Sequence, residues 1–336
     1  MGCTECADCA VSKGGLLKIF LTGGSGFVGG AVSLALSRQH DIVGLSRSLE
    51  SDAALLAHAA RPVRGDLQNV TSERIGDAEA VIHCAAYVEE WGPSALYDEI
   101  NVTGTERMLG AAKAAGVKRF VHVGTEAALF HGQHMRDIDE TYPLAPNSPF
   151  PYSRTKARAE ALVRAANDPA NGFETIVIRP RLVWGPGDKT VLPAVCEMVK
   201  AGKFAWIDGG AAMTSTTHVD NLVEAISLAL EGGKPGEAYF VTDGETLSFR
   251  DFLTRYLATA GVTPPDKSIP GWAARGLAAA TEPLWRMAGA KSPPPITRFT
   301  AAIMSRDCTI NDGKARAELG YRPVVSLDVG MGRLGN

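Results

Sequence analysis

The sequence has almost no excess charge of either sign: 34 Lys and Arg residues stand against 37 Asp and Glu residues, a net charge of −3 over 336 residues. Nucleic-acid-binding proteins usually carry a basic excess, so this balance disfavours DNA or RNA as a partner. No stretch reaches the roughly 20 apolar residues that a transmembrane segment needs. The first residues also lack the apolar segment of a signal peptide. We therefore expect a soluble, cytoplasmic protein.

Cysteine is scarce as well, with six residues in the chain. Three stand singly in apolar or mixed segments, as reduced thiols do: Cys84, Cys196 and Cys308. The others crowd the start of the chain as Cys3, Cys6 and Cys9, without the nearby fourth ligand that a closed metal site needs. The opening Met1-Gly2-Cys3 resembles a lipidation signal, but position six is not Ser or Thr. We predict a disordered tail over residues 1–15 and no metal.

Glycine and apolar residues dominate the next segment. The apolar run LLKIFL (16–21) leads into TGGSGFVGG and then into a stretch with helical spacing, the order strand, turn, helix. The pattern repeats, with strands predicted at 41–45, 80–86, 119–124 and 174–180 and helices at 94–115 and 153–166. Alternating strands and helices indicate an α/β fold with a doubly wound, Rossmann-type parallel sheet.

Two parts follow from this pattern. Residues 16–180, with 217–242 returning to them, are predicted to form an NAD(P)-binding Rossmann domain, interrupted after residue 125 by a long polar loop. Residues 181–216 and 243–330 are predicted to form a smaller, partly helical C-terminal substrate lobe. Its proline-rich stretch 264–297 is either an apolar cap or a helical pair covering the core. Membrane-surface contact is disfavoured because this stretch lacks a Lys/Arg-rich polar face.

The glycine turn predicts the first ligand. Gly23, Gly26 and Gly29 allow a tight turn and close backbone approach, so that a pyrophosphate can bind at the positive end of the following helix. The second strand ends in Ser46 and Arg47 with no carboxylate, which favours NADP over NAD while leaving NAD open. Asp66, after the third strand, either accepts a hydrogen bond from adenine or caps the next turn.

A second group of residues predicts chemistry. Tyr152 and Lys156 are four residues apart near the start of a predicted helix, so both project from one face. A phenol has an ordinary pKa near 10, and an adjacent ammonium favours its phenolate form. Thr125 follows a strand at the edge of the sheet where ligands bind, and its hydroxyl is expected to hydrogen-bond a substrate carbonyl.

The motifs TGGSGFVG, HCAA, NVTGT, GTEA, PYSRTK and RPRLVWGPGD resemble those of the extended short-chain dehydrogenase/reductases, over roughly residues 17–260. Within that superfamily the sequence is similar to the 3β-hydroxysteroid dehydrogenase-like branch of NAD(P)-dependent reductases, epimerases and dehydratases. The resemblance implies that Tyr152 donates or accepts the proton, that Lys156 assists it and anchors the ribose, and that Thr125 is the catalytic Ser/Thr. It also implies these cofactor contacts: Gly23, Ser25, Gly26, Phe27, Val28, Gly29, Arg47, Asp66, Leu67, Cys84, Ala85, Ala86, Asn101, Lys156 and Pro180.

The expected activity is interconversion of a secondary alcohol and a ketone on a small hydrophobic substrate, either steroid-like or a long-chain β-keto or β-hydroxy compound. Candidate substrate residues are Trp91, Trp184, Arg181, Trp272 and Trp285. Of Arg179 and Arg181, one is expected to orient the site and the other only to form an ion pair. Alternatives are a nucleotide-sugar epimerase or dehydratase that reduces its cofactor transiently, and a non-catalytic dinucleotide-binding sensor or scaffold. Relatives suggest a homodimer.

Overall fold

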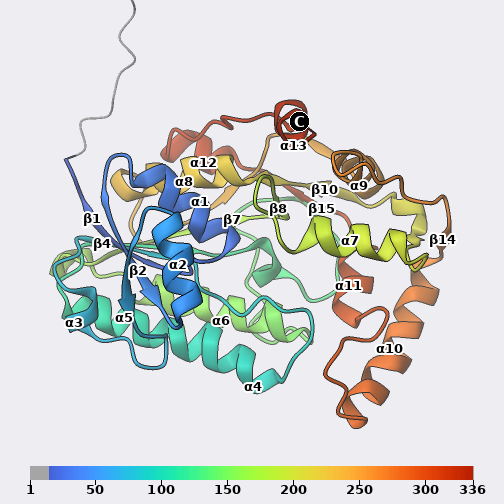
Figure 1. Cartoon of the computed structure of the whole chain (residues 1–336), viewed down its shortest axis with the longest axis horizontal. Coiled ribbons are helices and arrows are strands. Elements are labelled where there is room, and N and C mark those ends of the chain that lie inside the picture. The colour runs from blue at the N-terminus through green and yellow to red at the C-terminus, as the bar shows by residue number, and fades with distance from the viewer. Residues whose placement is uncertain (1–14, 336) are drawn as a thin grey trace, which may run out of the picture.

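The computed structural model describes residues 15–335, so the cysteine-rich start and its lipidation-like residues lie outside the described residues. Seven parallel strands form the central sheet in the order β3-β2-β1-β4-β5-β7-β12 (Figure 1). They are β1 (Lys18–Thr22), β2 (Asp41–Ser46), β3 (Arg61–Arg64), β4 (Ala80–His83), β5 (Arg119–Val123), β7 (Glu174–Pro180) and β12 (Ala238–Val241). The strand order reverses between β1 and β4, so the predicted doubly wound sheet is confirmed.

Helices cover both faces of this sheet (Figure 1). One face packs against α1 (Phe27–Leu36), α2 (Leu49–Ala57), α8 (Val219–Glu231) and α12 (Gly313–Glu318). The other packs against α3 (Ser72–Ile75), α5 (Gly104–Ala114) and α6 (Pro151–Ala165). The single helix predicted over 94–115 is instead α4 (Ser94–Tyr97), a π-helical segment η1 (Asp98–Thr103) and α5. Such π-helical segments occur often at functional sites.

The second part contains a smaller sheet in the order β13-β10-β15-β6 and two short strand pairs. Its strands are β6 (Met135–Ile138), β8 (Val183–Trp184), β9 (Trp206–Ile207), β10 (Met213–Ser215), β11 (Thr217–His218), β13 (Thr246–Ser248), β14 (Ser268–Ile269) and β15 (Cys308–Ile310). Its helices are α7 (Val191–Lys200), α9 (Phe249–Ala258), α10 (Gly271–Met287), α11 (Arg298–Ile303) and α13 (Leu327–Leu334). Short 3₁₀ turns occur at η2 (Glu126–Leu129), η3 (Pro169–Asn171) and η4 (Asp208–Gly210).

The two parts exchange segments that the sequence boundaries did not anticipate. The long loop expected after residue 125 contains η2 and β6, and β6 pairs with β15 in the smaller sheet. In the other direction, Ala315, Leu319 and Tyr321 come from the range assigned to the lobe but pack in the core of the large sheet. Both segments are short, so hydrophobic periodicity along the chain gives little indication of which sheet they join.

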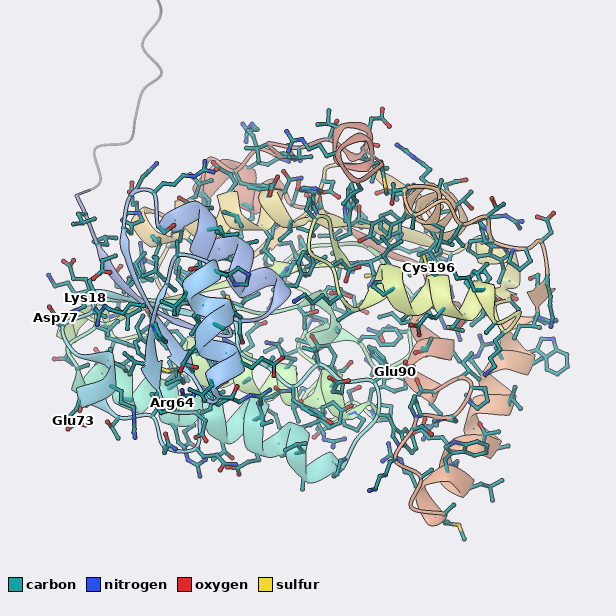
Figure 2. All side chains as sticks on the ribbon, in the orientation of Figure 1. Lys18, Arg64, Glu73, Asp77, Glu90 and Cys196 are labelled. Atoms are coloured by element: carbon teal, nitrogen blue, oxygen red, sulfur yellow. The ribbon has the colours of Figure 1, made fainter. Side chains whose placement is uncertain are left out.

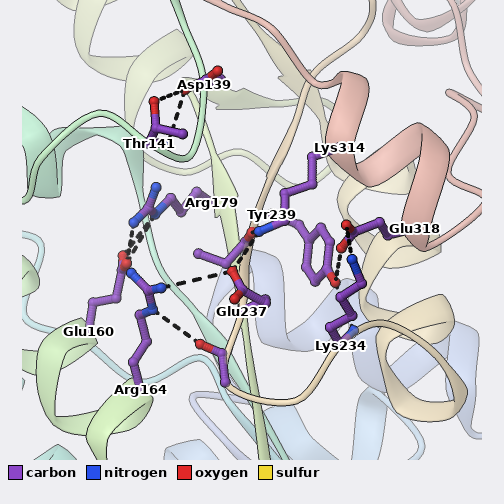
Figure 3. A network of polar contacts seen from close by, with 12 residues as sticks. Asp139, Thr141, Glu160, Arg164, Arg179, Lys234, Glu237, Tyr239, Lys314 and Glu318 are labelled. Atoms are coloured by element: carbon purple, nitrogen blue, oxygen red, sulfur yellow. Dashed lines mark hydrogen bonds and ion pairs between the residues drawn. The ribbon is translucent and has the colours of Figure 1, made fainter.

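A network of polar contacts fixes α6 and α12 to the outer edge of the sheet, as Figure 3 shows. Lys314 on α12 donates to Glu237 at 2.6 Å, and Arg164 on α6 lies 3.9 Å from the same carboxylate. The hydroxyl of Tyr239 on β12 donates to Glu318 at 2.9 Å. Exposed pairs of this kind each stabilise a fold by less than about 1 kcal/mol. The network therefore mainly sets where α6 lies relative to the sheet edge.

Candidate active site

The predicted cofactor and catalytic residues gather at the carboxyl ends of the parallel strands. They follow or end six strands: Gly23 after β1, Arg47 after β2, Asp66 and Leu67 after β3, Cys84 to Ala86 after β4, Thr125 after β5, and Pro180 at the end of β7. In open α/β sheets this edge, near the reversal of strand order, is where ligands bind. One edge therefore carries residues that were predicted separately from distant parts of the sequence.

The turn between β1 and α1 has the backbone geometry of an anion site. Gly23 has a φ of +74°, and a Cβ added there would lie 2.8 Å from the backbone nitrogen of Ala85. A Cβ on Gly29 would collide with the carbonyl of Gly23. The N-cap is Gly26, and within residues 15–335 no side chain caps α1 and no carboxylate lies in its first turn. The first N–H groups of α1 thus suit the pyrophosphate of a dinucleotide.

The residues expected to contact the adenosine end of the cofactor differ in whether they already form hydrogen bonds or ion pairs within the protein. Arg47 is exposed just beyond β2 and forms no ion pair within the described part of the chain. Asp66 accepts hydrogen bonds from the backbone N–H groups of Gln68 at 2.8 Å and Asn69 at 3.1 Å. The turn-capping alternative for Asp66 is therefore present, through its Oδ1 atom.

Asn101 connects two loops of the site. It is buried in η1, where its Oδ1 accepts from the backbone N–H of Tyr87 at 2.7 Å. Its Nδ2 donates to the Tyr87 carbonyl and to the hydroxyl of Thr155 on α6, each at 3.1 Å. Asn101 thereby fixes the segment after β4 against the helix that carries Tyr152 and Lys156.

Thr125 is held by the two residues that follow it in the chain. It is the N-cap of η2, and its Oγ1 accepts from the backbone N–H of Ala127 at 3.2 Å. The same hydroxyl donates to the carboxylate of Glu126 at 2.8 Å. Glu126 is buried and pairs with the guanidinium of Arg181 at 2.5 Å. Because a hydroxyl carries one proton, Thr125 can donate a hydrogen bond to a substrate only after its bond to Glu126 is broken. The sequence did not indicate this bond to Glu126.

Tyr152 lies in the first turn of α6 and is half-buried, with its ring edge-on to Phe299 of α11 at 6.1 Å between centroids. Burial raises the pKa of its phenol, and the negative charge of Glu126 raises that pKa further. A hydrogen bond with Thr125 acts in the opposite direction. The phenol is therefore neutral at physiological pH and able to donate a proton.

Lys156 lies one turn further along α6 and is buried. Its Nζ donates to the Val123 carbonyl at 2.9 Å and lies 3.4 Å from Nε2 of His122. Burial lowers the pKa of Lys156 to about 8, although the charge of Glu160 acts against this shift. Burial and the Lys156 charge also lower the pKa of His122, so its imidazole is neutral. The expected lowering of the Tyr152 pKa by Lys156 is not found; burial and Glu126 set that pKa.

Comparison with known proteins identifies the family. A profile of the 3-beta hydroxysteroid dehydrogenase/isomerase family matches residues 20–270. The chain belongs to this family. It is 39% identical over 322 residues to 4-hydroxy-2-methyl-3-oxo-4-farnesyl-3,4-dihydroquinoline-1-oxide ketoreductase of Stigmatella aurantiaca, covering 95% of this chain and 96% of that one. It is 33% identical to 2-alkyl-3-oxoalkanoate reductase of Stenotrophomonas maltophilia (strain K279a), covering 95% of this chain and 98% of that protein.

Solved structures agree on the architecture. The crystal structure of gox2253 superposes with a TM-score of 0.75 at 28% identity, over 93% of this chain and 95% of that one. UDP-glucuronic acid 4-epimerase from Bacillus cereus in complex with NAD has a TM-score of 0.71 at 19% identity, over 95% and 100%. The second likeness shows the fold alone. Membership of the 3-beta hydroxysteroid dehydrogenase/isomerase family makes the chain an NAD(P)-dependent oxidoreductase of the short-chain dehydrogenase/reductase type.

The structure places the predicted substrate residues of this family member in different environments. Trp184 is fully buried among lobe residues and donates to Asp243 at 2.7 Å, so it does not line a substrate mouth. Arg181 is likewise buried in its pair with Glu126. Trp272 is 74% exposed on the outside of α10, whereas Trp285 is half-buried. Large apolar residues at irregular spacing gave no indication of which side of the lobe they would face.

Trp91, the remaining candidate substrate residue, is engaged by the lobe. Its indole N–H donates to the Ala290 carbonyl at 2.9 Å, and the guanidinium of Arg286 lies 4.5 Å above its ring. Trp91 therefore joins the segment after β4 to the end of α10. Its indole N–H is already used in this contact.

Sequence reasoning missed Glu126, which contacts Thr125 directly. The available signal was its position, since Glu126 is the only charged residue in the apolar segment TEAALF (125–130). A carboxylate inside such a segment is rarely buried unless it is paired. The partner, Arg181, lies 55 residues later and could not be found from spacing.

Proposed function

We propose that this chain is a ketoreductase that reduces the 3-oxo group of a hydrophobic substrate, long-chain or steroid-like, to a secondary alcohol. The observation that carries the proposal is the polar group at the end of β5, where Thr125 donates to the buried carboxylate of Glu126. Both residues act on the pKa of the Tyr152 phenol, which Glu126 raises and Thr125 lowers. The reductase names of the two relatives described above support the same direction.

The residues of the site suit proton delivery to a carbonyl oxygen. A bound nicotinamide cofactor would supply the hydride that reduces the carbonyl carbon. Tyr152 gives its phenolic proton to the carbonyl oxygen, so the O–H bond of the phenol breaks as that of the alcohol forms. Glu126 favours this donor form in two ways, because its charge raises the pKa of Tyr152 and it holds the one proton of Thr125. The phenolate is then reprotonated from solvent.

Lys156 and Asn101 position the reacting groups. Lys156 is fixed by the Val123 carbonyl and stands beside the neutral His122, so its ammonium is available to ribose hydroxyls along the carboxyl edge of the sheet. Asn101 keeps the segment after β4 at a constant distance from α6. The first turn of α1 would hold the pyrophosphate. Arg47, exposed and without an ion pair among residues 15–335, supports NADP as the preferred cofactor.

The test is turnover of the full-length chain with NADPH or NADH and a panel of ketones: long-chain 2-alkyl-3-oxo acids, 3-oxosteroids and aryl ketones. We expect loss of the reduced nicotinamide absorbance with an equal amount of alcohol formed. Product from a UDP- or dTDP-sugar without net change in that absorbance would instead establish an epimerase or dehydratase. Cofactor binding without turnover of any compound would favour a sensor or scaffold.

The proposal includes a homodimer located in the cytoplasm. Sedimentation velocity of the purified chain would test the dimer, and fractionation of cells would test the location. Neither outcome bears on the reaction, which the ketone panel measures directly.

A further inference from the structure

Three consecutive residues of the loop between β4 and α4 contact the C-terminal lobe: Glu90, Trp91 and Gly92. The indole N–H of Trp91 donates to a lobe carbonyl at 2.9 Å, and the guanidinium of Arg286 lies 4.5 Å above its ring. That guanidinium also donates to the Gly92 carbonyl at 3.5 Å. Arg286 lies in the last turn of α10, which, like every other helix of residues 15–335, is not long and apolar enough to cross a membrane. The partners are 194 to 210 positions apart in the chain, so only folding brings this loop and the lobe together.

Glu90 contacts the first turn of α11. Its Oε1 atom accepts a hydrogen bond from the hydroxyl of Thr297 at 2.7 Å and another from the hydroxyl of Thr300. Thr297 is the N-cap of α11, where its own oxygen accepts from the backbone N–H of Thr300 at 3.1 Å. Figure 2 shows Glu90 between the body of the protein and the C-terminal helices. The carboxylate therefore fixes the residue that begins α11.

Phe299, the second residue of α11, extends this contact to the tyrosine of the proposed reaction. Its ring is edge-on to Tyr152 at 6.1 Å between centroids and edge-on to Phe150 at 5.5 Å. Phe150 is the N-cap of α6 and is buried, so it does not yield easily. Edge-to-face packing is a preferred geometry of aromatic rings. Phe299 is thus held on one side by α6 and contacts Tyr152 from the lobe.

The orientation of the Tyr152 ring matters for proton donation. Its phenolic oxygen must come within hydrogen-bond reach of the carbonyl oxygen that it protonates. A tyrosine ring rotates about two side-chain torsions, so the groups packed against it decide where the phenol lies. Among the residues that the structure describes, Phe299 is the one aromatic ring in contact with Tyr152. Loosening α11 would therefore displace the phenol without removing it.

We propose that Glu90 is a positioning residue for ketone reduction: it holds the start of α11, and α11 holds Phe299 against Tyr152. The inference rests on the proposed function, since Glu90 has no chemical step of its own. Glu90 is exposed, whereas Thr297 is 3% exposed. Removing the Glu90 side chain therefore leaves the packed core in place, and its effect is on the position of α11.

Steady-state ketone reduction by full-length variants tests this proposal. Glu90→Leu removes both hydrogen bonds and should lower kcat about tenfold or more, because a small displacement of a reacting group slows the reaction strongly. The Kd for NADPH, measured by isothermal titration calorimetry, should stay the same. Glu90→Gln keeps an oxygen acceptor and should restore kcat to within about twofold of the wild type. The matched control is Glu89→Leu, an exposed neighbour whose side chain forms no hydrogen bond or ion pair among residues 15–335.

A double variant tests whether Glu90 acts through Phe299. Phe299→Leu should lower kcat by a similar factor, and Glu90→Leu/Phe299→Leu should lose no more than either single variant. Hydrogen exchange of the α11 amides, measured without substrate, should be faster in Glu90→Leu and unchanged in Glu90→Gln.

Four results would overturn the proposal: wild-type kcat in Glu90→Leu, unchanged exchange in that variant, an equal loss in Glu90→Gln, or multiplied losses in the double variant. A wild type that reduces no ketone would overturn the proposed function together with this inference. Wild-type turnover that is insensitive to Glu90→Leu would overturn this inference alone, so the two failures are distinguishable.

Discussion

Two buried arginine–glutamate pairs lie on either side of Pro180, and they differ in what their carboxylates touch. Arg179 in β7 binds Glu160 on α6, with both side chains 1% exposed. Arg181, two residues later, binds Glu126, at 2% and 5%. Glu126 also accepts a hydrogen bond from Thr125, whereas Glu160 contacts no catalytic hydroxyl in the described part of the chain. A buried pair contributes little net stability over an apolar replacement. The difference therefore suggests that one pair orients a helix and the other a catalytic group.

The largest effect is expected at the tyrosine nearest the second pair. Tyr152→Phe removes the proton donor and should lower kcat for ketone reduction by about 10²–10⁴-fold, the usual contribution of a positioned acid. Cofactor affinity, measured by quenching of protein fluorescence, should stay the same. The matched control is Tyr142→Phe, a half-buried tyrosine that packs against the same apolar cluster as Phe299. A comparable loss in both variants would mean that Tyr152 acts through packing.

The two pairs can be separated by removing one charge from each. Glu126→Gln and Glu160→Gln each leave a buried arginine unpaired, so each should lower the free energy of unfolding by about 3–5 kcal/mol in urea titrations. Their pH profiles should differ. The Glu126 charge raises the pKa of Tyr152, so its removal should shift the rise of alcohol oxidation to lower pH.

Glu160→Gln is the matched variant for that shift, because its carboxylate acts on the pKa of Lys156 and is not among the charges acting on Tyr152. The part of its oxidation profile that reports ionisation of the Tyr152 phenol should stay at the wild-type pH once corrected for folded protein. Identical pH profiles of alcohol oxidation in the Glu126→Gln and Glu160→Gln variants would contradict the proposed difference between the two ion pairs. Glu126 would then be structural, like Glu160.

Lys156 tests the first ion pair, because it lies one helical turn before Glu160 on α6. Burial lowers the pKa of Lys156 from 10.5 to about 8, so below pH 8 both the folded and the unfolded chain carry the proton. Between about 8 and 10.5 the unfolded chain binds more protons, and stability should rise with pH by roughly 3 kcal/mol. Urea titrations of cofactor-free wild type and Lys156→Met should therefore diverge across this window. Parallel curves would contradict the lowered pKa.

The part that could be predicted from the sequence is the part where each motif follows a strand of a regular parallel sheet. Gly23 and Thr125 were placed from their positions after predicted strands, because every strand of such a sheet ends at the same edge, whereas Pro180 came from the family resemblance. The strand at 174–180 agrees with β7 residue for residue. Strands β1, β2, β4 and β5 and helix α6 agree to within a few residues.

What could not be predicted depends on contacts between distant segments. Glu126 and Arg181 meet across 55 residues, and β6 joins β15 across about half the chain. Trp184 and Trp272 are the same residue type and lie in segments of similar composition. Trp184 is nevertheless in the core, whereas Trp272 is 74% exposed. Short strands and isolated aromatic residues have no periodicity from which a facing direction could be read.

A third arginine, Arg47, is the opposite of the two buried ones, because it is exposed and unpaired within the described residues. If it binds the 2′-phosphate of NADP, Arg47→Ala should raise the Kd for NADPH about tenfold at low salt and leave NADH unchanged, since an exposed charge pair is worth about 1 kcal/mol. Arg38→Ala, another exposed arginine at the far end of α1, is the control. Isothermal titration calorimetry with both nucleotides measures the ratio. An unchanged ratio would mean that cofactor choice lies elsewhere at this edge, and the comparison would then apply to buried arginines only.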